Sequence, residues 1–217
     1  MVYVSGGIFT MGATSEQGSE ADRDEKPTHQ VTLSSFSIGR YEVTQEEWEA
    51  VMGSNPSHFK GAKRPVERVS WNDCQTFIRK LNAMTGKNFR LPTEAEWEFA
   101  ARGGNSSRGY KYAGGNSLGS VVWYDDNSND QTHNVGTKSP NELGLYDMSG
   151  NVWEWCSDWY GSYSSSSQTN PKGPSTGSYR VFRGGSWYNN ARYCRVSNRS
   201  NNSPGYSDDN LGFRLAH

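Results

Sequence analysis

Helical periodicity is confined to the first half of this chain, and this limits the folds that the chain can adopt. Between residues 44 and 104, three segments begin with Ser or Thr and carry an acidic residue at the third position after it. This spacing is the signature of a capping box. Apolar residues then recur at helical spacing. The sequence therefore predicts helices that start after Thr44, Ser70 and Thr93, with ends near Gly86 for the second and Gly103-Gly104 for the third.

Short runs typical of β-strands precede these helices. They cover Val2–Val4, Gly7–Met11 and Val31–Leu33, and the last of them leads into Phe36–Tyr41. The polar, acidic segment Ser15–Lys26 between them is predicted to be a loop.

After residue 104 the chain is rich in Gly, Asn, Ser and Asp, and short aromatic runs interrupt long loops. The Ser-rich stretch Gly161–Thr176 is predicted to be a long loop, and loops of this length in compact domains are usually functional or mobile. No internal repeat and no compositional boundary divides the chain. We therefore predict one α+β domain over residues 1–217, with helices in the first half and loop-rich β structure in the second.

Composition excludes several classes of function. The formal net charge of the 217 residues is −1, so we expect neither nucleic acid nor an anionic membrane as partner. No apolar run approaches the length of a membrane span. The start of the chain has no basic segment and no apolar signal core. We therefore expect a protein that stays inside the cell or one whose targeting segment is not part of this sequence.

The cysteines offer little chemistry. Cys74, Cys156 and Cys194 are odd in number and have no CxxC spacing for zinc or redox chemistry. One disulfide or none can form, and none is the expectation. Cys74 lies on the apolar face of a predicted helix and is expected to be a buried structural thiol.

The segment between Trp187 and Leu211 has a restricted composition. It contains no Lys, Glu, Gln, Met or Trp. These residue types have no codon ending in C, whereas Asn, Tyr, Ser, Gly and Asp all arise from AAC by changes at its adenines. This is the composition expected where Asn codons are mutated at adenine. It is also close to that of antibody binding loops, where Tyr supplies rigid amphipathic area and Ser, Gly and Asn supply adaptable hydrogen bonds.

An ordinary polar loop explains the same composition in a second way. Asn, Gly, Ser, Asp and Pro are favoured in turns for conformational reasons alone. Composition by itself leaves both explanations open.

Short motifs follow one another along the chain in a specific order. They are Gly6–Gly12, Tyr41–Thr44, Pro65–Val66, Val69–Trp71, Arg90–Glu98, Gly144–Met148, Gly150–Trp155, Arg183–Trp187 and Asn210–Arg214. Together they resemble the formylglycine-generating-enzyme, or sulfatase-modifying-factor, domain family across nearly the whole chain. Each motif alone is weak, but their order is specific. The resemblance implies a C-type-lectin-like α+β fold that is loop-rich, with little regular secondary structure.

This scaffold hosts enzymes and binding proteins, so the site must decide the function. In the generating enzyme of the family, a pair of cysteines after the GGS motif binds copper and attacks the sulfatase cysteine. Here those positions fall near Asn189 and Ala191, which cannot supply a thiolate, and Cys194 lies off them. A second branch, iron-dependent sulfoxide synthases, uses a histidine triad. The four histidines of this chain are scattered, so we expect no catalytic residue and no catalytic cofactor.

The C-terminal segment resembles most the variable proteins of diversity-generating retroelements. That resemblance implies a non-catalytic, ligand-binding receptor in which adenine-directed reverse transcription rewrites positions within residues 184–214, here called the variable segment. The residues kept between them, here called the anchors, are Gly184–Trp187, Cys194–Ser197, Arg199, Pro204 and Gly212–Arg214. The rewritten residues, here called the candidate contact positions, are Tyr188, Asn190, Tyr193, Ser200, Asn202, Ser203, Gly205, Tyr206, Ser207, Asp208 and Asp209.

The role of each position follows from its chemistry. Tyr188, Tyr193 and Tyr206 are expected to be the main contacts, because Tyr is enriched in binding hot spots. The two aspartates would favour basic or hydroxyl-rich ligands. Asn189, Asn198 and Asn201 stay undecided between variable and anchor roles. The resemblance implies an unknown protein or glycan ligand on another cell or particle surface, with the receptor displayed on a cell surface or on a phage or virus particle.

The resemblance also suggests a structural calcium ion. In the resembling enzymes calcium is held around the segment that matches Asp147–Glu154. Here Asp147 and Glu154 offer carboxylates, and Gly150 and Val152 offer backbone carbonyls, which are hard oxygen ligands. The alternative is that Glu154 only supports turns beside the neighbouring tryptophans.

Two other functions remain open. One is a sulfatase-modifying-factor-like enzyme, formylglycine-generating or iron-dependent, with a divergent active site. The other is a scaffold or secretion-associated protein that kept only the fold. The enzyme predicts a metal or a nucleophile in a cleft, and the scaffold predicts that the segment shows no adenine-biased variation.

Overall fold

The computed structural model describes all residues, 1–217, and its longer helices begin where the capping boxes predict. They are α1 (Gln45–Met52), α2 (Trp71–Thr85) and α3 (Glu94–Ala101). In each, the hydroxyl of the capping Ser or Thr accepts the N3 backbone N–H, and the N3 acid accepts the backbone N–H of the cap. The first two helices end at Gly53 and Gly86, both left-handed, which confirms the predicted end near Gly86.

The strands form three small sheets. In the first, β1 (Val2–Val4) pairs with β4 (Phe36–Ile38) in antiparallel fashion. The order of the second is β2 (Gly7–Met11), β3 (His29–Leu33) and β6 (Gln168–Thr169). The order of the third, which is central, is β8 (Arg199–Asn202), β7 (Arg180–Arg183), β5 (Trp153–Trp159) and β9 (Leu211–Gly212).

Three local predictions need correction. The strand expected to continue to Tyr41 ends at Ile38, after which the Gly39 N–H donates to the carbonyl of Leu215 near the C-terminus. The predicted loop Ser15–Lys26 contains two short 3₁₀ helices, Ser15–Glu20 and Arg23–Glu25. A one-turn helix, α4 (Leu118–Val121), lies in the half where no helix was expected, and it is too short to show a periodic pattern.

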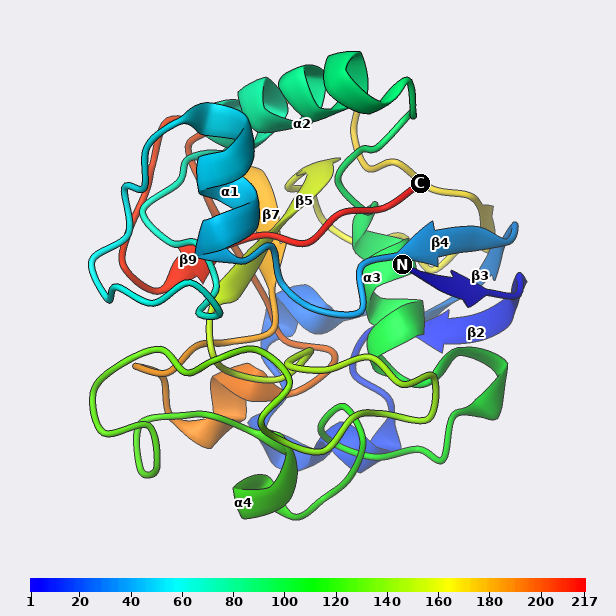
Figure 1. Ribbon diagram of the computed structural model, residues 1–217. Coiled ribbons are helices and arrows are strands. Elements are labelled where there is room, and N and C mark those ends of the chain that lie inside the picture. Colours follow the sequence, from blue (N-terminus) through cyan, green and yellow to red (C-terminus); the bar gives the residue numbers. More distant parts are fainter.

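Figure 1 shows how these elements are arranged. Helices α1 and α2 lie together at one end of the central sheet, and the long loops with α4 lie at the other. Helix α3 contacts β2 and β3 as well as β5 and β7. One core cluster lies around α3 and the second sheet, and another joins α1 and α2 to the central sheet.

Helix α3 is buried on all sides. All eight of its residues are buried, among them Glu94, Glu96 and Glu98. A buried carboxylate is stable only when it is paired and hydrogen-bonded. The variable segment and the strand that leads into it supply arginine partners for Glu94 and Glu98.

Candidate functional site

The variable segment contributes two strands and a 3₁₀ turn to the fold. Tyr193 lies in the turn Ala191–Cys194, while Ser200 and Asn202 lie on β8. None of the candidate contact positions is buried, and the Tyr188 side chain is 66% exposed. The anchors between them are buried, apart from the half-buried Pro204. In this segment the candidate contact positions therefore face solvent, and all anchors except Pro204 face the interior.

Part of the variable segment encloses a shallow hollow. Its volume is about 270 Å³. The candidate contact positions that line it are Tyr193, Ser200, Asn202 and Tyr206. The other lining residues are the undecided Asn189 and Asn201, together with Trp153, Phe182, Asn210 and Leu211, which sequence reasoning had not placed in the site. A ligand group that enters this hollow meets aromatic faces and amide groups together.

The undecided asparagines divide into different roles. Asn189 accepts a hydrogen bond from the Trp153 indole N–H at 2.8 Å and another from the Ser186 hydroxyl at 2.6 Å. Asn198 is 1% exposed and donates to Glu25 at 3.3 Å, so it lies in the interior beside the anchors. Asn201 is half-buried and lines the hollow. The sequence could not distinguish them because the distinction depends on partners far away in the chain.

The acidic end of the segment is engaged within the protein. The Tyr206 hydroxyl donates to Asp208 Oδ2 at 2.6 Å, and this bond raises the pKa of Tyr206 to about 12. Asp208 Oδ1 accepts the Asp209 backbone N–H at 2.9 Å. The Arg68 guanidinium lies 3.7 Å from the Asp209 carboxylate. These aspartates therefore fix the loop as well as facing solvent, and Arg68 is a neighbour that sequence reasoning missed.

Glycines show which positions tolerate a side chain. A Cβ on Gly205 would meet no atom within 4 Å. A Cβ on the anchor Gly185, at φ +72°, would lie 2.6 Å from Cys194 Sγ. A Cβ on Gly212 would lie 2.4 Å from the carbonyl oxygen of Val66. Substitution is thus sterically open at the candidate contact position and closed at both anchors.

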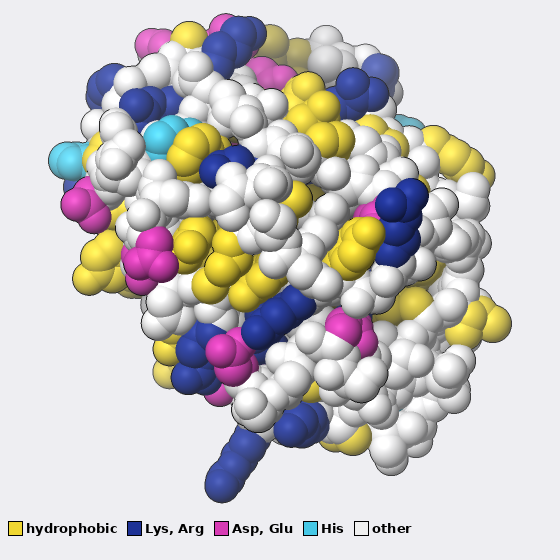
Figure 2. Space-filling model, turned by 90° about the horizontal axis from the view of Figure 1, so that it is seen from below, with side chains coloured by type: hydrophobic (Ala, Val, Ile, Leu, Met, Phe, Trp, Pro, Cys, Tyr) yellow, Lys and Arg dark blue, Asp and Glu magenta, His cyan; other side chains and the backbone are white.

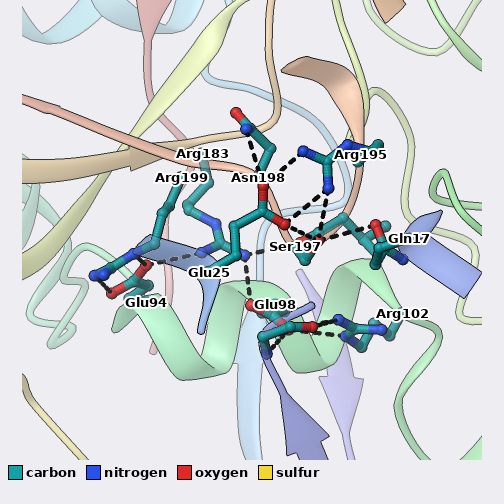
Figure 3. Close-up of polar contacts among 12 residues, drawn as sticks. Gln17, Glu25, Glu94, Glu98, Arg102, Arg183, Arg195, Ser197, Asn198 and Arg199 are labelled. Atoms are coloured by element: carbon teal, nitrogen blue, oxygen red, sulfur yellow. Dashed lines mark hydrogen bonds and ion pairs between the residues drawn. The ribbon is translucent and has the colours of Figure 1, made fainter. Parts of the chain in front are cut away.

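Buried arginines attach the variable segment to the rest of the fold (Figure 3). The Arg195 guanidinium pairs with Glu25 through two hydrogen bonds, of 2.8 and 2.6 Å. Ser197 donates to the same carboxylate at 2.5 Å. Burial alone would raise the pKa of Glu25, but the hydrogen bonds from Arg195 and Ser197 outweigh it and lower this pKa to about 2. The carboxylate therefore stays ionised over the physiological pH range.

The other buried arginines bind the acids of α3 and β5. Arg199 pairs with both oxygens of Glu94 at 2.7 Å. Arg183 reaches Glu94 at 2.8 Å and Glu98 at 2.5 Å, as Figure 3 shows. Arg214 pairs with both oxygens of Glu154 at 2.6 Å. The variable segment is thus joined to the rest of the fold by charge-assisted hydrogen bonds at Arg195, Arg199 and Arg214.

The thiols and histidines do not form a cluster. All three cysteines are free and buried. Burial raises the pKa of Cys194, which opposes formation of a thiolate. His29 packs against Tyr163 and His133 stacks on Trp123 with ring centroids 3.7 Å apart. No group of three or more His, Cys, Asp or Glu side chains is arranged to hold a metal ion.

The carboxylates expected to bind calcium are engaged within the protein. Both Glu154 oxygens accept from Arg214, and Oε2 also accepts the Trp97 indole N–H at 2.7 Å. Asp147 Oδ2 accepts the Gly136 N–H, while the Val152 N–H is bound to Glu42. The strongest ligand of the set is already neutralised by a guanidinium. Calcium binding remains a prediction that no observation tests.

The surface at the α4 end is mixed in character. Figure 2 shows hydrophobic side chains in several small groups and charged side chains of both signs scattered among uncharged ones. No broad patch of one charge covers this face, which agrees with the net charge of −1. None of the helices has the length and apolar character that a bilayer crossing requires.

Comparison with known proteins gives matches over all or most of the chain. Residues 1–217 match the family described as the sulfatase-modifying factor enzyme 1-like domain. The Chaperone protein LppX of Paenibacillus barcinonensis is 35% identical over an alignment of 247 positions, gaps included, which spans 91% of this chain and 81% of that protein. The Formylglycine-generating enzyme of Streptomyces coelicolor is 34% identical over an alignment of 286 positions, gaps included, which spans 100% of this chain and 88% of that enzyme.

A solved structure is similar over the same length. Treponema denticola variable protein 1 superimposes with a TM-score of 0.90 and 38% sequence identity. The match covers 100% of this chain and 94% of that one. The predicted resemblance and the C-type-lectin-like α+β fold are confirmed by these matches.

Proposed function

This chain belongs to the sulfatase-modifying factor enzyme 1-like domain family, and we propose that within it the chain is a ligand-binding receptor and not an enzyme. Specifically, it is a variable protein of a diversity-generating retroelement, and the variable segment is its binding surface. One observation carries this proposal: the candidate contact positions are all exposed or half-buried, while the anchors that alternate with them are buried, apart from Pro204. The likeness to Treponema denticola variable protein 1 supports it.

Binding would rely on a scaffold that does not have to order itself. The buried Arg–Glu pairs fix the backbone of the variable segment before a ligand arrives, so little ordering cost is incurred on binding. Tyr188, Tyr193 and Tyr206 supply rigid amphipathic area, and the neighbouring amides supply adaptable hydrogen bonds. The ligand is a protein or glycan on another cell or particle surface. The receptor itself is displayed on a cell surface or on a phage or virus particle.

The decisive experiment is to sequence the DNA around the gene. A copy of the region encoding residues 184–214 should lie near a reverse transcriptase gene and should differ only at its adenines. The differences should fall on the candidate contact positions and spare the anchors. A locus with no such copy would overturn the proposal, and the residue composition would then be that of an ordinary loop.

An enzyme with a divergent active site is the second candidate, favoured by the likeness to the Formylglycine-generating enzyme of Streptomyces coelicolor. Asn189 and Ala191 stand near the positions that resemblance assigns to the catalytic cysteines, and Cys194 is buried. We expect no conversion of a cysteine-containing sulfatase peptide, with or without copper, when the product is analysed by mass spectrometry. Formation of formylglycine would establish the enzymatic alternative. A variant with Asn189→Cys serves as the matched comparison, since it restores only a single thiol.

A further inference from the structure

A second cavity lies away from the variable surface. Its volume is about 550 Å³, and it is lined by the start of α3, the end of β5, strand β6 and the Ser-rich loop that follows β5. The polar groups around it belong to His29, Glu94, Asp158, Gln168 and Lys172, among others. None of the candidate contact positions lines it. Its volume falls within the range of small-molecule sites.

Asp158 is the distinctive group of this cavity. Its residue is 4% exposed. Oδ2 accepts the Glu94 backbone N–H at 3.0 Å and the Ser157 hydroxyl at 2.9 Å. Oδ1 accepts no hydrogen bond from the protein, and the carboxylate takes part in none of the ion pairs of the fold. An ionised carboxylate in such a position is costly unless a cation reaches it.

The nearby cations of the protein are already engaged or exposed. Arg199 and Arg183 are paired with Glu94, the other carboxylate of the cavity. Arg180 lies between the rings of Trp71 and Trp159, at 3.9 and 3.4 Å from their centroids, and donates to the Ser157 carbonyl. Lys172 is exposed and forms no ion pair. Of the two carboxylates that line the cavity, Glu94 is paired with arginines and Asp158 takes part in no ion pair.

We propose that this cavity binds a primary ammonium group, which donates to Asp158 Oδ1. An ammonium carries several donors and no acceptor, so the side-chain oxygens of Gln168 and Thr169 can accept its remaining N–H groups. Such a group can come from a free amine or from a lysine side chain of another protein. This site is independent of the variable surface, and its failure would leave the proposed receptor function untouched.

The test is calorimetric titration of the whole protein with putrescine and, separately, with its uncharged diol analogue. Putrescine should bind and the diol should not, because only the amine carries a positive charge that can pair with the Asp158 carboxylate. Asp158→Asn should weaken putrescine binding by about tenfold to a hundredfold, the usual effect of losing a charge-assisted hydrogen bond. Asp130→Asn, at an exposed carboxylate outside the cavity, is the matched control and should bind like the wild type.

Folding of the variant is checked by its thermal unfolding. The amide introduced by Asp158→Asn keeps an oxygen for the Glu94 N–H, so the variant is expected to fold. A lysine-containing peptide is the second probe. Tighter binding of the peptide identifies a protein lysine as the source, and binding of putrescine alone identifies a free amine. If neither amine binds the wild type, or if putrescine and the diol bind equally, the proposal is wrong.

Discussion

Replacing Arg195 by Met would remove a central contact between the variable segment and the rest of the fold. Neither the Arg195 nor the Glu25 side chain is exposed to solvent, and two hydrogen bonds join them. Met occupies much of the volume of the arginine stem but leaves the carboxylate without its cation. Breaking a buried ion pair costs about 3–5 kcal/mol. Because Ser197 and Asn198 still donate to Glu25, we expect the lower end, about 3 kcal/mol.

The free energy of unfolding in urea measures this cost, and Arg192→Met is the matched control. Arg192 pairs with Asp22, but the two side chains are 40% and 37% exposed, so its loss should cost about 0–1 kcal/mol. The cost of Arg195→Met should also shrink as the pH falls from about 4.5 towards 2, because the low pKa of Glu25 stabilises the fold only while that carboxyl is ionised. Equal costs for the two variants would refute the assigned role of the buried pair.

Three further outcomes are expected. Burial raises the pKa of Asp158 from 3.8 to about 7, so its carboxyl lowers stability increasingly as the pH rises between these values. The free energy of unfolding of Asp158→Asn, measured in urea, should therefore match that of the wild type near pH 4. Above pH 7 it should exceed the wild-type value by up to about 4 kcal/mol, growing by about 1.4 kcal/mol per pH unit in between. A difference that shrinks with rising pH would contradict this. The buried cysteines should resist a thiol reagent in the native protein and react fully once it is unfolded, and rapid native labelling would show that a thiol is accessible. Tyr188→Ser should change the free energy of unfolding by less than about 0.5 kcal/mol, whereas Gly185→Ala should lower it by about 2 kcal/mol or more, and similar costs would contradict the division between contacts and anchors.

Local sequence determined the three longer helices. A capping box is complete within four residues, so the helices that follow Thr44, Ser70 and Thr93 can be predicted from the local sequence alone. Strand β6 has only two residues and pairs with β3, more than a hundred residues earlier in the chain. Such a strand has no local pattern, and only the tertiary structure reveals it.

The alternation of solvent-facing and buried positions in the variable segment was also readable from sequence, because loop-type residues alternate with Gly, Trp and Arg there. The partners of those arginines were not readable. Glu25, Glu94 and Glu154 come from a 3₁₀ turn, a helix and a strand that are distant in sequence. A buried guanidinium requires an acidic partner, but which acid lies close enough depends on how the chain folds. For the same reason Glu154, expected from resemblance to be a calcium ligand, is the counterion of Arg214 in the folded protein.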